Sequence, residues 1–106
     1  MKYIFTIFHN KECNFWRILK GRLEKFISEK HLDAEIEEVL INNEEEAKKY
    51  RFAGSPQLTL NGKDIDPMAN LITNFHIAGC RPVFWKGKSY DYPPMEMVEE
   101  AIKAGS

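Results

Sequence analysis

The sequence predicts one α/β domain, spanning residues 1–106, in which helices cover both faces of a mixed sheet of four or five strands. Three observations predict this class. In the first half, apolar runs of strand length alternate with amphipathic stretches of helix length. An Asn-Gly pair between two short segments marks a tight hairpin. A proline-led amphipathic stretch closes the chain. The predicted order is β-α-β-α-β-β, an insertion, and a final α-helix.

The first half of the chain supplies two strands and two helices. Residues 3–8 are almost continuously apolar or aromatic, which is typical of a strand buried on both faces. Residues 14–30 carry apolar side chains at helical spacing: Phe15, Leu19, Leu23, Phe26 and Ile27. Residues 34–41 predict a second strand, parallel to the first because a helix connects the two, although their imperfect alternation also allows part of the segment to be helical. Two asparagines followed by glutamates then predict a short helix that ends near Tyr50.

The second half supplies a hairpin, an insertion and the last helix. Asn61-Gly62 predicts the hairpin turn, because both residues tolerate a positive φ. Residues 67–79 predict a loop or a short helix. Residues 80–85 predict a short strand, which a proline restricts to a sheet edge, and the chain then turns back. The final helix opens at Pro94 and carries the apolar stripe Met95, Val98 and Ile102.

The composition is that of an ordinary folded domain. The chain is 43% hydrophobic and 29% charged, and its formal net charge of −1 gives no basic footprint for nucleic acid. No apolar stretch has the length of a membrane span, and the apolar start is too short for a signal sequence. Two cysteines do not make a disulfide scaffold. We therefore expect a cytoplasmic monomer or homodimer with reduced thiols.

Several stretches of the sequence match a known pattern. Cys13 stands at the start of the first predicted helix, Ser55-Pro56 stands directly before a strand, and "LTLNGKDI" forms the following hairpin. With the later "CRPVFW" and "PPMEMVEEAI", these stretches resemble the thioredoxin and glutaredoxin fold family. More narrowly, they resemble a group of small bacterial and archaeal thioredoxin-like proteins. The resemblance covers nearly the whole chain.

The resemblance implies a thioredoxin-like sandwich and a redox role. It implies that the peptide bond before Pro56 is cis and that this proline faces Cys13. In such proteins the backbone beside the proline pairs with an extended partner, so Ser55 and Pro56 are candidate substrate-binding residues. We add Trp16, which stands where thioredoxins carry their second cysteine, although its place in the apolar stripe also suits the core. The implied partner is a protein or small-molecule thiol or disulfide, and no cofactor is expected.

Cys13 is the candidate nucleophile. The local motif is Cys13-Asn14-Phe15-Trp16, which lacks the resolving thiol of a thioredoxin. A helix beginning at Asn14 would direct unpaired N–H groups and a partial positive charge toward the sulfur, and both favour the reactive thiolate. The alternative is an inert structural cysteine.

Cys80 is the candidate resolving thiol. It could close a long-range disulfide with Cys13 if the two Cα atoms lie within about 7 Å of each other. The alternative is a free cysteine. Each cysteine also follows a histidine, His9 and His76, at the same spacing, so a soft-metal site with two sulfur and two nitrogen ligands is a further hypothesis.

Three functions therefore remain open. The first is a thiol–disulfide oxidoreductase with Cys13 as nucleophile. The second is a binding module that keeps the fold without turnover. The third is a soft-metal or metalloid protein that uses Cys13 and Cys80. An aromatic group in the insertion suits either core packing or an exposed binding edge: Phe84, Trp85, Tyr90 and Tyr92.

Overall fold

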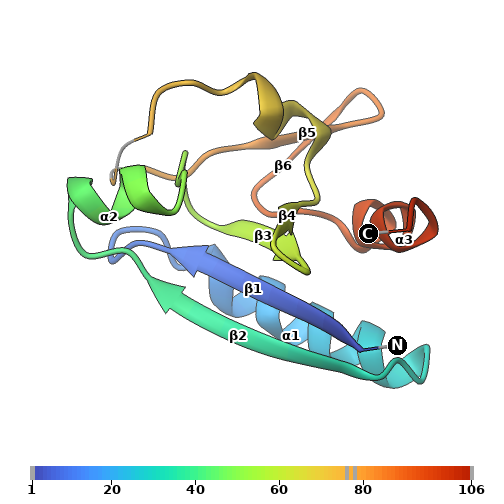
Figure 1. The fold of residues 1–106 in the computed structure, drawn as a ribbon. Helices are drawn as coiled ribbons and strands as arrows, with labels where there is room; N and C mark the ends of the chain where they lie inside the picture. Colours follow the sequence, from blue (N-terminus) through green and yellow to red (C-terminus); the bar gives the residue numbers. More distant parts are fainter. Residues whose placement is uncertain (1, 76, 78, 106) are drawn as a thin grey trace.

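The computed structural model describes residues 2–75, 77 and 79–105 and contains three α-helices, one 3₁₀ helix and six strands in this part of the chain. The order of the elements follows the predicted order, with a second hairpin as the insertion (Figure 1). The bounds are β1 (Tyr3–His9), α1 (Phe15–Glu29), β2 (Ala34–Leu40), α2 (Glu44–Lys49), β3 (Gln57–Leu60), β4 (Lys63–Asp64), the 3₁₀ helix η1 (Pro67–Leu71), β5 (Val83–Trp85), β6 (Lys88–Tyr90) and α3 (Met95–Lys103).

The main sheet has four strands in the order β2-β1-β3-β4. β1 and β2 are parallel, with Tyr3 opposite Ala34, and α1 makes the crossover between them. β3 runs antiparallel to β1, and β4 returns from β3 through the turn at Asn61 and Gly62, both of which have positive φ. The predicted mixed sheet is confirmed with four strands.

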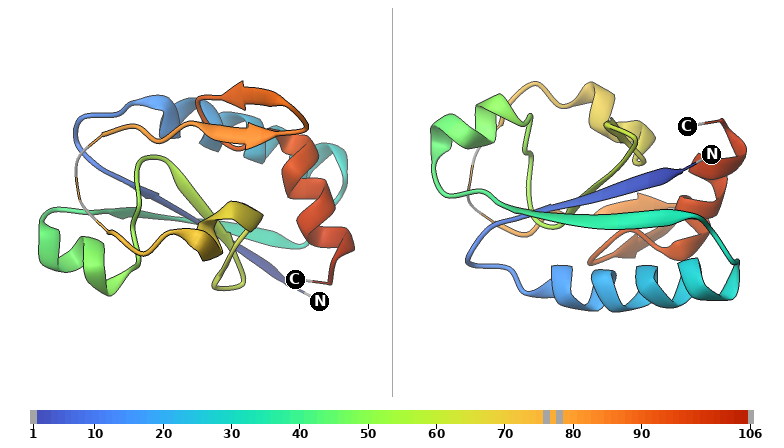
Figure 2. Two further views of the ribbon diagram at one scale, coloured as in Figure 1. Left: turned by 90° about the horizontal axis from the view of Figure 1, so that it is seen from above. Right: turned by 60° about the horizontal axis from the view of Figure 1, so that its bottom comes forward.

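Two apolar cores lie on opposite faces of this sheet. On one face α1 and α3 pack against alternate residues of β1, and the buried members are Phe5, Ile7, Leu19, Leu23, Phe26, Leu58, Leu60, Ile65, Val83, Met97 and Val98. On the other face α2 covers a smaller group, Ile41, Ala47 and Phe52. Figure 2 shows α1 and α2 on opposite sides of the sheet. Helices on both faces are therefore confirmed.

The helix α2 owes its start to the predicted cap. The Asn43 side chain accepts a hydrogen bond from the Glu46 N–H at 2.8 Å, and the Glu46 carboxylate accepts the Asn42 N–H at 2.8 Å. This reciprocal arrangement satisfies N–H groups that a helix end leaves without partners. The helix start predicted from the asparagine–glutamate spacing is therefore confirmed.

The insertion forms a separate two-stranded sheet, β5–β6, instead of adding a fifth strand to the main sheet. This hairpin lies over α1 in the view from above (Figure 2). Trp85, Tyr90 and Tyr92 pack against the larger core, whereas Phe84 is 64% exposed. Most of the aromatic group is therefore core packing, and one ring faces solvent.

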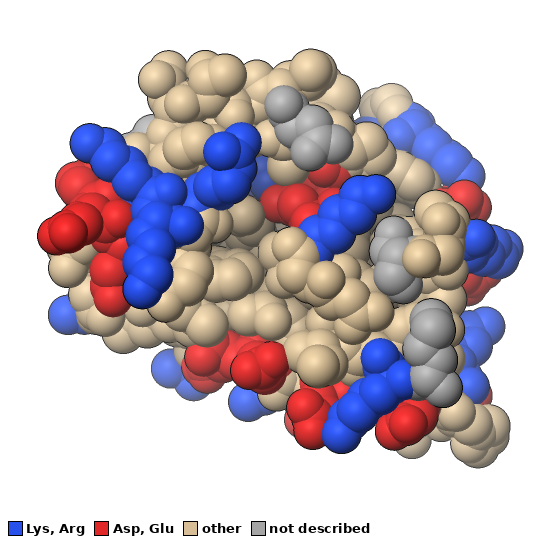
Figure 3. Space-filling view, in the orientation of Figure 1, with Lys and Arg blue, Asp and Glu red and all other residues tan. Residues whose placement is uncertain are grey.

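Of the two alternatives predicted for residues 67–79, a loop or a short helix, the structure has a short helix, η1, at the start of this segment. Asp66 caps it by accepting the Met68 N–H at 3.0 Å, and Pro67 takes the first helical position. Among the described residues no helix has both the length and the apolar character needed to cross a membrane. On the face shown in Figure 3, acidic and basic side chains lie next to one another.

Candidate functional site

Cys13 and Cys80 form a disulfide that joins two loops 67 residues apart in the sequence. Their Cα atoms are 5.7 Å apart, which meets the distance condition for a bond. The structure thus contains the long-range disulfide that the sequence left open, and the expectation of reduced thiols does not hold in it. The two partners differ in accessibility, because Cys13 is 1% exposed whereas Cys80 lies at the surface. Cys80 is therefore the more exposed residue of the pair.

Cys13 lies just before α1, as predicted. Asn14 flanks the helix without a side-chain cap, and the first turn carries no acidic residue. Cys13 therefore directly precedes a helix end that has no side-chain cap and no acidic residue in its first turn.

Ser55 and Pro56 lie directly beside the disulfide. The peptide bond between them is cis, as the resemblance implies, and both residues are buried. The Ser55 carbonyl oxygen is 3.6 Å from the Cys13 Sγ atom. These two candidate substrate-binding residues thus lie next to the disulfide.

The backbone of Ser55 is already paired with the chain itself. Its N–H donates to the Gly79 carbonyl at 3.2 Å, and its carbonyl accepts the Arg81 N–H at 3.2 Å, forming a short parallel bridge. We call residues 79–81 the Cys80 segment. In the disulfide form, this segment occupies the edge that the resemblance assigns to an extended partner.

Asn10 is a site residue that the sequence analysis missed. It is 2% exposed and lies between β1 and Cys13. Its amide nitrogen donates to the carbonyl oxygens of Ile77 (2.8 Å) and Gly79 (2.9 Å). Its amide oxygen accepts the N–H groups of Cys13 (2.9 Å) and Glu12 (3.1 Å). A single side chain therefore holds the loop before α1 against the Cys80 segment.

Trp16 is half-buried and packs on His9. The two rings stack with centroids 4.1 Å apart and planes 14° apart, and the Arg17 guanidinium lies 4.7 Å from the centre of the indole. The His9 Nε2 atom is 3.4 Å from the Glu38 carboxylate. The stack fixes Trp16 at the end of α1 that carries Cys13. A contact of Trp16 with a partner stays a prediction.

A buried ion pair anchors the other side of the Cys80 segment. The Arg81 guanidinium donates to the Asp66 carboxylate at 3.0 Å, and the two side chains are 18% and 3% exposed. Gly54 packs so closely here that an added Cβ would collide with the Cβ of Arg81. Glycine at this position, with φ of +141°, therefore allows the segment to approach Ser55.

Asp64 lies near this ion pair, and the pKa of its carboxyl is strongly raised. Burial raises the pKa of its carboxyl to about 6, against the lowering effects of a hydrogen bond from the Asp66 N–H and the charge of Arg81. Its Oδ1 atom accepts that N–H at 2.8 Å, whereas the buried Oδ2 atom has no partner. Among the described acidic residues, this carboxyl has a pKa close to neutrality.

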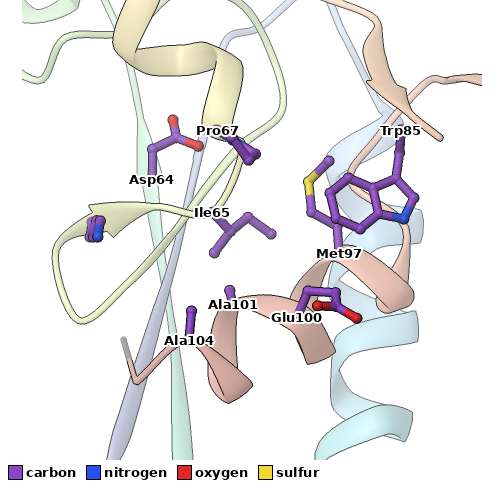
Figure 4. A pocket seen from close by; sticks show the side chains of 9 residues that line it. Asp64, Ile65, Pro67, Trp85, Met97, Glu100, Ala101 and Ala104 are labelled. Carbon is purple, nitrogen blue, oxygen red and sulfur yellow. The ribbon is translucent and has the colours of Figure 1, made fainter. Parts of the chain in front are cut away.

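A pocket of about 370 Å³ lies away from the disulfide, between the β3–β4 hairpin and α3 (Figure 4). Ile65, Trp85 and Met97 line its apolar part, and neither cysteine reaches it. Asp64 is at its rim with the carboxylate directed away from α3. The disulfide therefore lies outside this pocket.

The soft-metal hypothesis needs free sulfurs. In this state the two sulfurs are bonded to each other, so neither is a thiolate ligand. His76, the fourth proposed ligand, lies outside the described residues. Among the residues that are described, no three His, Cys, Asp or Glu side chains are grouped to hold a metal ion.

No family model matches the sequence, and no curated protein matches it. A function must therefore be inferred from the chemistry of the site.

Proposed function

We propose that this chain is a thioredoxin-like protein that exchanges disulfides with a thiol partner through Cys13 and Cys80. The supporting observation is the pairing of one buried and one exposed cysteine in a single disulfide beside Ser55 and Pro56. The strand order β2-β1-β3-β4, with the buried cysteine just before α1, supports the thioredoxin-like assignment.

The accessibility of the cysteines suggests their roles. The Cys80 thiolate attacks one sulfur of a partner disulfide, forms a mixed disulfide and releases one partner thiolate. The Cys13 thiolate then attacks the Cys80 sulfur, restores the Cys13–Cys80 bond and releases the second partner thiolate. The pair of cysteines is oxidised by two electrons, the partner disulfide is reduced by two, and water protonates the released thiolates. These roles reverse the sequence-based expectation, in which Cys13 attacks.

Trapping of the mixed disulfide tests this proposal. The reduced wild-type protein should reduce a synthetic peptide disulfide and recover its own disulfide. In Cys13→Ser the resolving step is lost, so a peptide–Cys80 adduct should accumulate and be detected by intact mass. In Cys80→Ser the buried Cys13 should form the adduct more slowly, by about tenfold or more, because thiol exchange requires access to the sulfur.

Two outcomes would contradict the proposal. The reduced wild type could react with the peptide disulfide no faster than free cysteine does, which would leave the bond as a structural disulfide. Alternatively, the adduct could form only on Cys13, which would restore the original assignment of the attacking thiol. Stoichiometric zinc binding by the reduced protein, lost in both variants, would favour the metal hypothesis.

A further inference from the structure

Asn10 hydrogen-bonds both to the backbone of Cys13 and to that of Gly79, next to Cys80. We propose that Asn10 is a positioning residue that holds the Cys80 segment against Cys13 in the reduced protein, and so sets the equilibrium between disulfide and dithiol. This inference rests on the proposed function, since it concerns the same pair of cysteines. The proposed function gives the order in which the two thiols react, whereas this inference concerns the equilibrium between their disulfide and dithiol forms.

The amide of Asn10 is fully used. Both of its N–H groups donate, to the Ile77 and Gly79 carbonyls, and its oxygen accepts two backbone N–H groups, one of them from Cys13. The backbone N–H of Asn10 also donates to the Ser55 Oγ atom at 3.4 Å. These bonds join the loop carrying Cys13, the strand edge at Ser55 and the chain leading to Cys80.

These hydrogen bonds affect the redox equilibrium because they and the disulfide favour the same arrangement, with Cys80 beside Cys13. In the oxidised protein the disulfide, the Asn10 hydrogen bonds, the backbone bridge to Ser55 and the Arg81–Asp66 ion pair together keep Cys80 beside Cys13. In the reduced protein the covalent bond is absent, and the side-chain hydrogen bonds of Asn10 then help to keep the two thiols together, which raises the effective concentration of one thiol at the other. Weakening these bonds should therefore destabilise the disulfide relative to the dithiol.

Few other side chains could replace this amide. The position requires two donors directed at carbonyl groups and one acceptor for N–H groups. Aspartate accepts but does not donate, and serine has one donor. A residue needed only for packing would not require this combination at a site 2% exposed.

The test is the equilibrium constant of the Cys13–Cys80 disulfide in dithiothreitol buffers, read by alkylation and intact mass. We expect Asn10→Ser and Asn10→Asp to lower this constant about tenfold, the effect of losing two hydrogen bonds of ordinary net strength. The matched control is Asn61→Ser, which removes a side-chain hydrogen bond to the Ile4 N–H at the end of β1 opposite Cys13. It should lower overall stability and leave the constant within about twofold of the wild-type value.

A second measurement covers the case in which an Asn10 variant does not fold. In the reduced wild type, the side-chain amide protons of Asn10 should stay protected from exchange in NMR spectra. Rapid exchange of both protons, or an unchanged constant in a folded Asn10 variant, would overturn the inference. Both readouts use the protein alone. A failure to reduce the peptide disulfide would contradict the proposed function without affecting this result.

Discussion

The Cys80 segment is attached to the rest of the molecule on two sides, and the two attachments differ in chemistry. Toward Cys13 it is held by a disulfide and by the neutral amide of Asn10. Toward η1 it is held by the buried ion pair of Arg81 and Asp66, next to the carboxyl of Asp64. One attachment depends on redox state and the other on charge.

The difference also concerns how well the polar groups are satisfied. On the neutral side the Asn10 amide uses both donors and accepts two hydrogen bonds. On the charged side, the buried Nε atom of Arg81 and Oδ2 atom of Asp64 have no partners. A buried charge without full pairing costs stability, so the charged attachment is the costlier of the two. The hydrogen bonds of Asn10 therefore stabilise the segment, whereas the charged attachment carries the free-energy cost of burying incompletely paired charges.

Opening the disulfide should produce the largest effect. The bond closes a loop across a separation of 67 residues, and a loop of this length corresponds to about 4 kcal/mol of unfolding free energy in the chain-entropy description. Urea unfolding of the oxidised and reduced protein measures this difference. Cys80→Ser under reducing conditions should match the reduced wild type, since Cys80 is exposed. An oxidised protein no more stable than Cys80→Ser would contradict the prediction.

Arg81→Ala should produce the next largest effect. It leaves the Asp66 carboxylate, 3% exposed, without its cationic partner, and breaking one side of a buried pair costs about 3 kcal/mol. The measurement is urea unfolding of the oxidised protein at neutral pH. Lys86→Ala is the control, because it removes an exposed ion pair with Glu96 and should lower the unfolding free energy far less than Arg81→Ala does. Equal losses in the two variants would show that burial of the Arg81 pair is unimportant.

The fold was predictable where the signals are local. The apolar run of β1, the stripe of α1, the Asn61-Gly62 turn and the asparagine cap of α2 all depend on neighbouring residues. The separate β5–β6 sheet was not predicted, because a short strand does not specify which sheet it joins. Its neighbours depend on the path of the whole chain.

The candidate site was predictable only in part. The resemblance placed Ser55 and Pro56 beside Cys13, but the sequence left the pairing of Cys13 with Cys80 open. Asn10 was missed because its decisive partners are backbone carbonyls 67 and 69 residues away, which no side-chain pattern marks. The local signal, an asparagine three residues before the cysteine, predicts at most the loop contacts with Glu12 and Cys13.

Asp64→Asn should produce the smallest of the three effects, and with the opposite sign. Burial raises the pKa of Asp64 to about 6, above its value in the unfolded chain. Between about pH 4 and pH 6 the folded protein therefore binds more protons than the unfolded chain, and stability falls as pH rises through this window. Replacing the charge should raise the free energy of unfolding by about 2 kcal/mol near pH 8 and change it little near pH 4.

The pH dependence separates this mechanism from a simple packing effect. Asparagine keeps an oxygen that can accept the Asp66 N–H, so the variant mainly removes the buried charge. Asp91→Asn, at an exposed carboxylate, is the control and should leave the unfolding free energy nearly unchanged at both pH values. A loss of stability in Asp64→Asn near pH 8 would mean that the Asp64 carboxylate supports Arg81. The Asp64 carboxylate would then be a third charged group, beside Arg81 and Asp66, that stabilises the Cys80 segment.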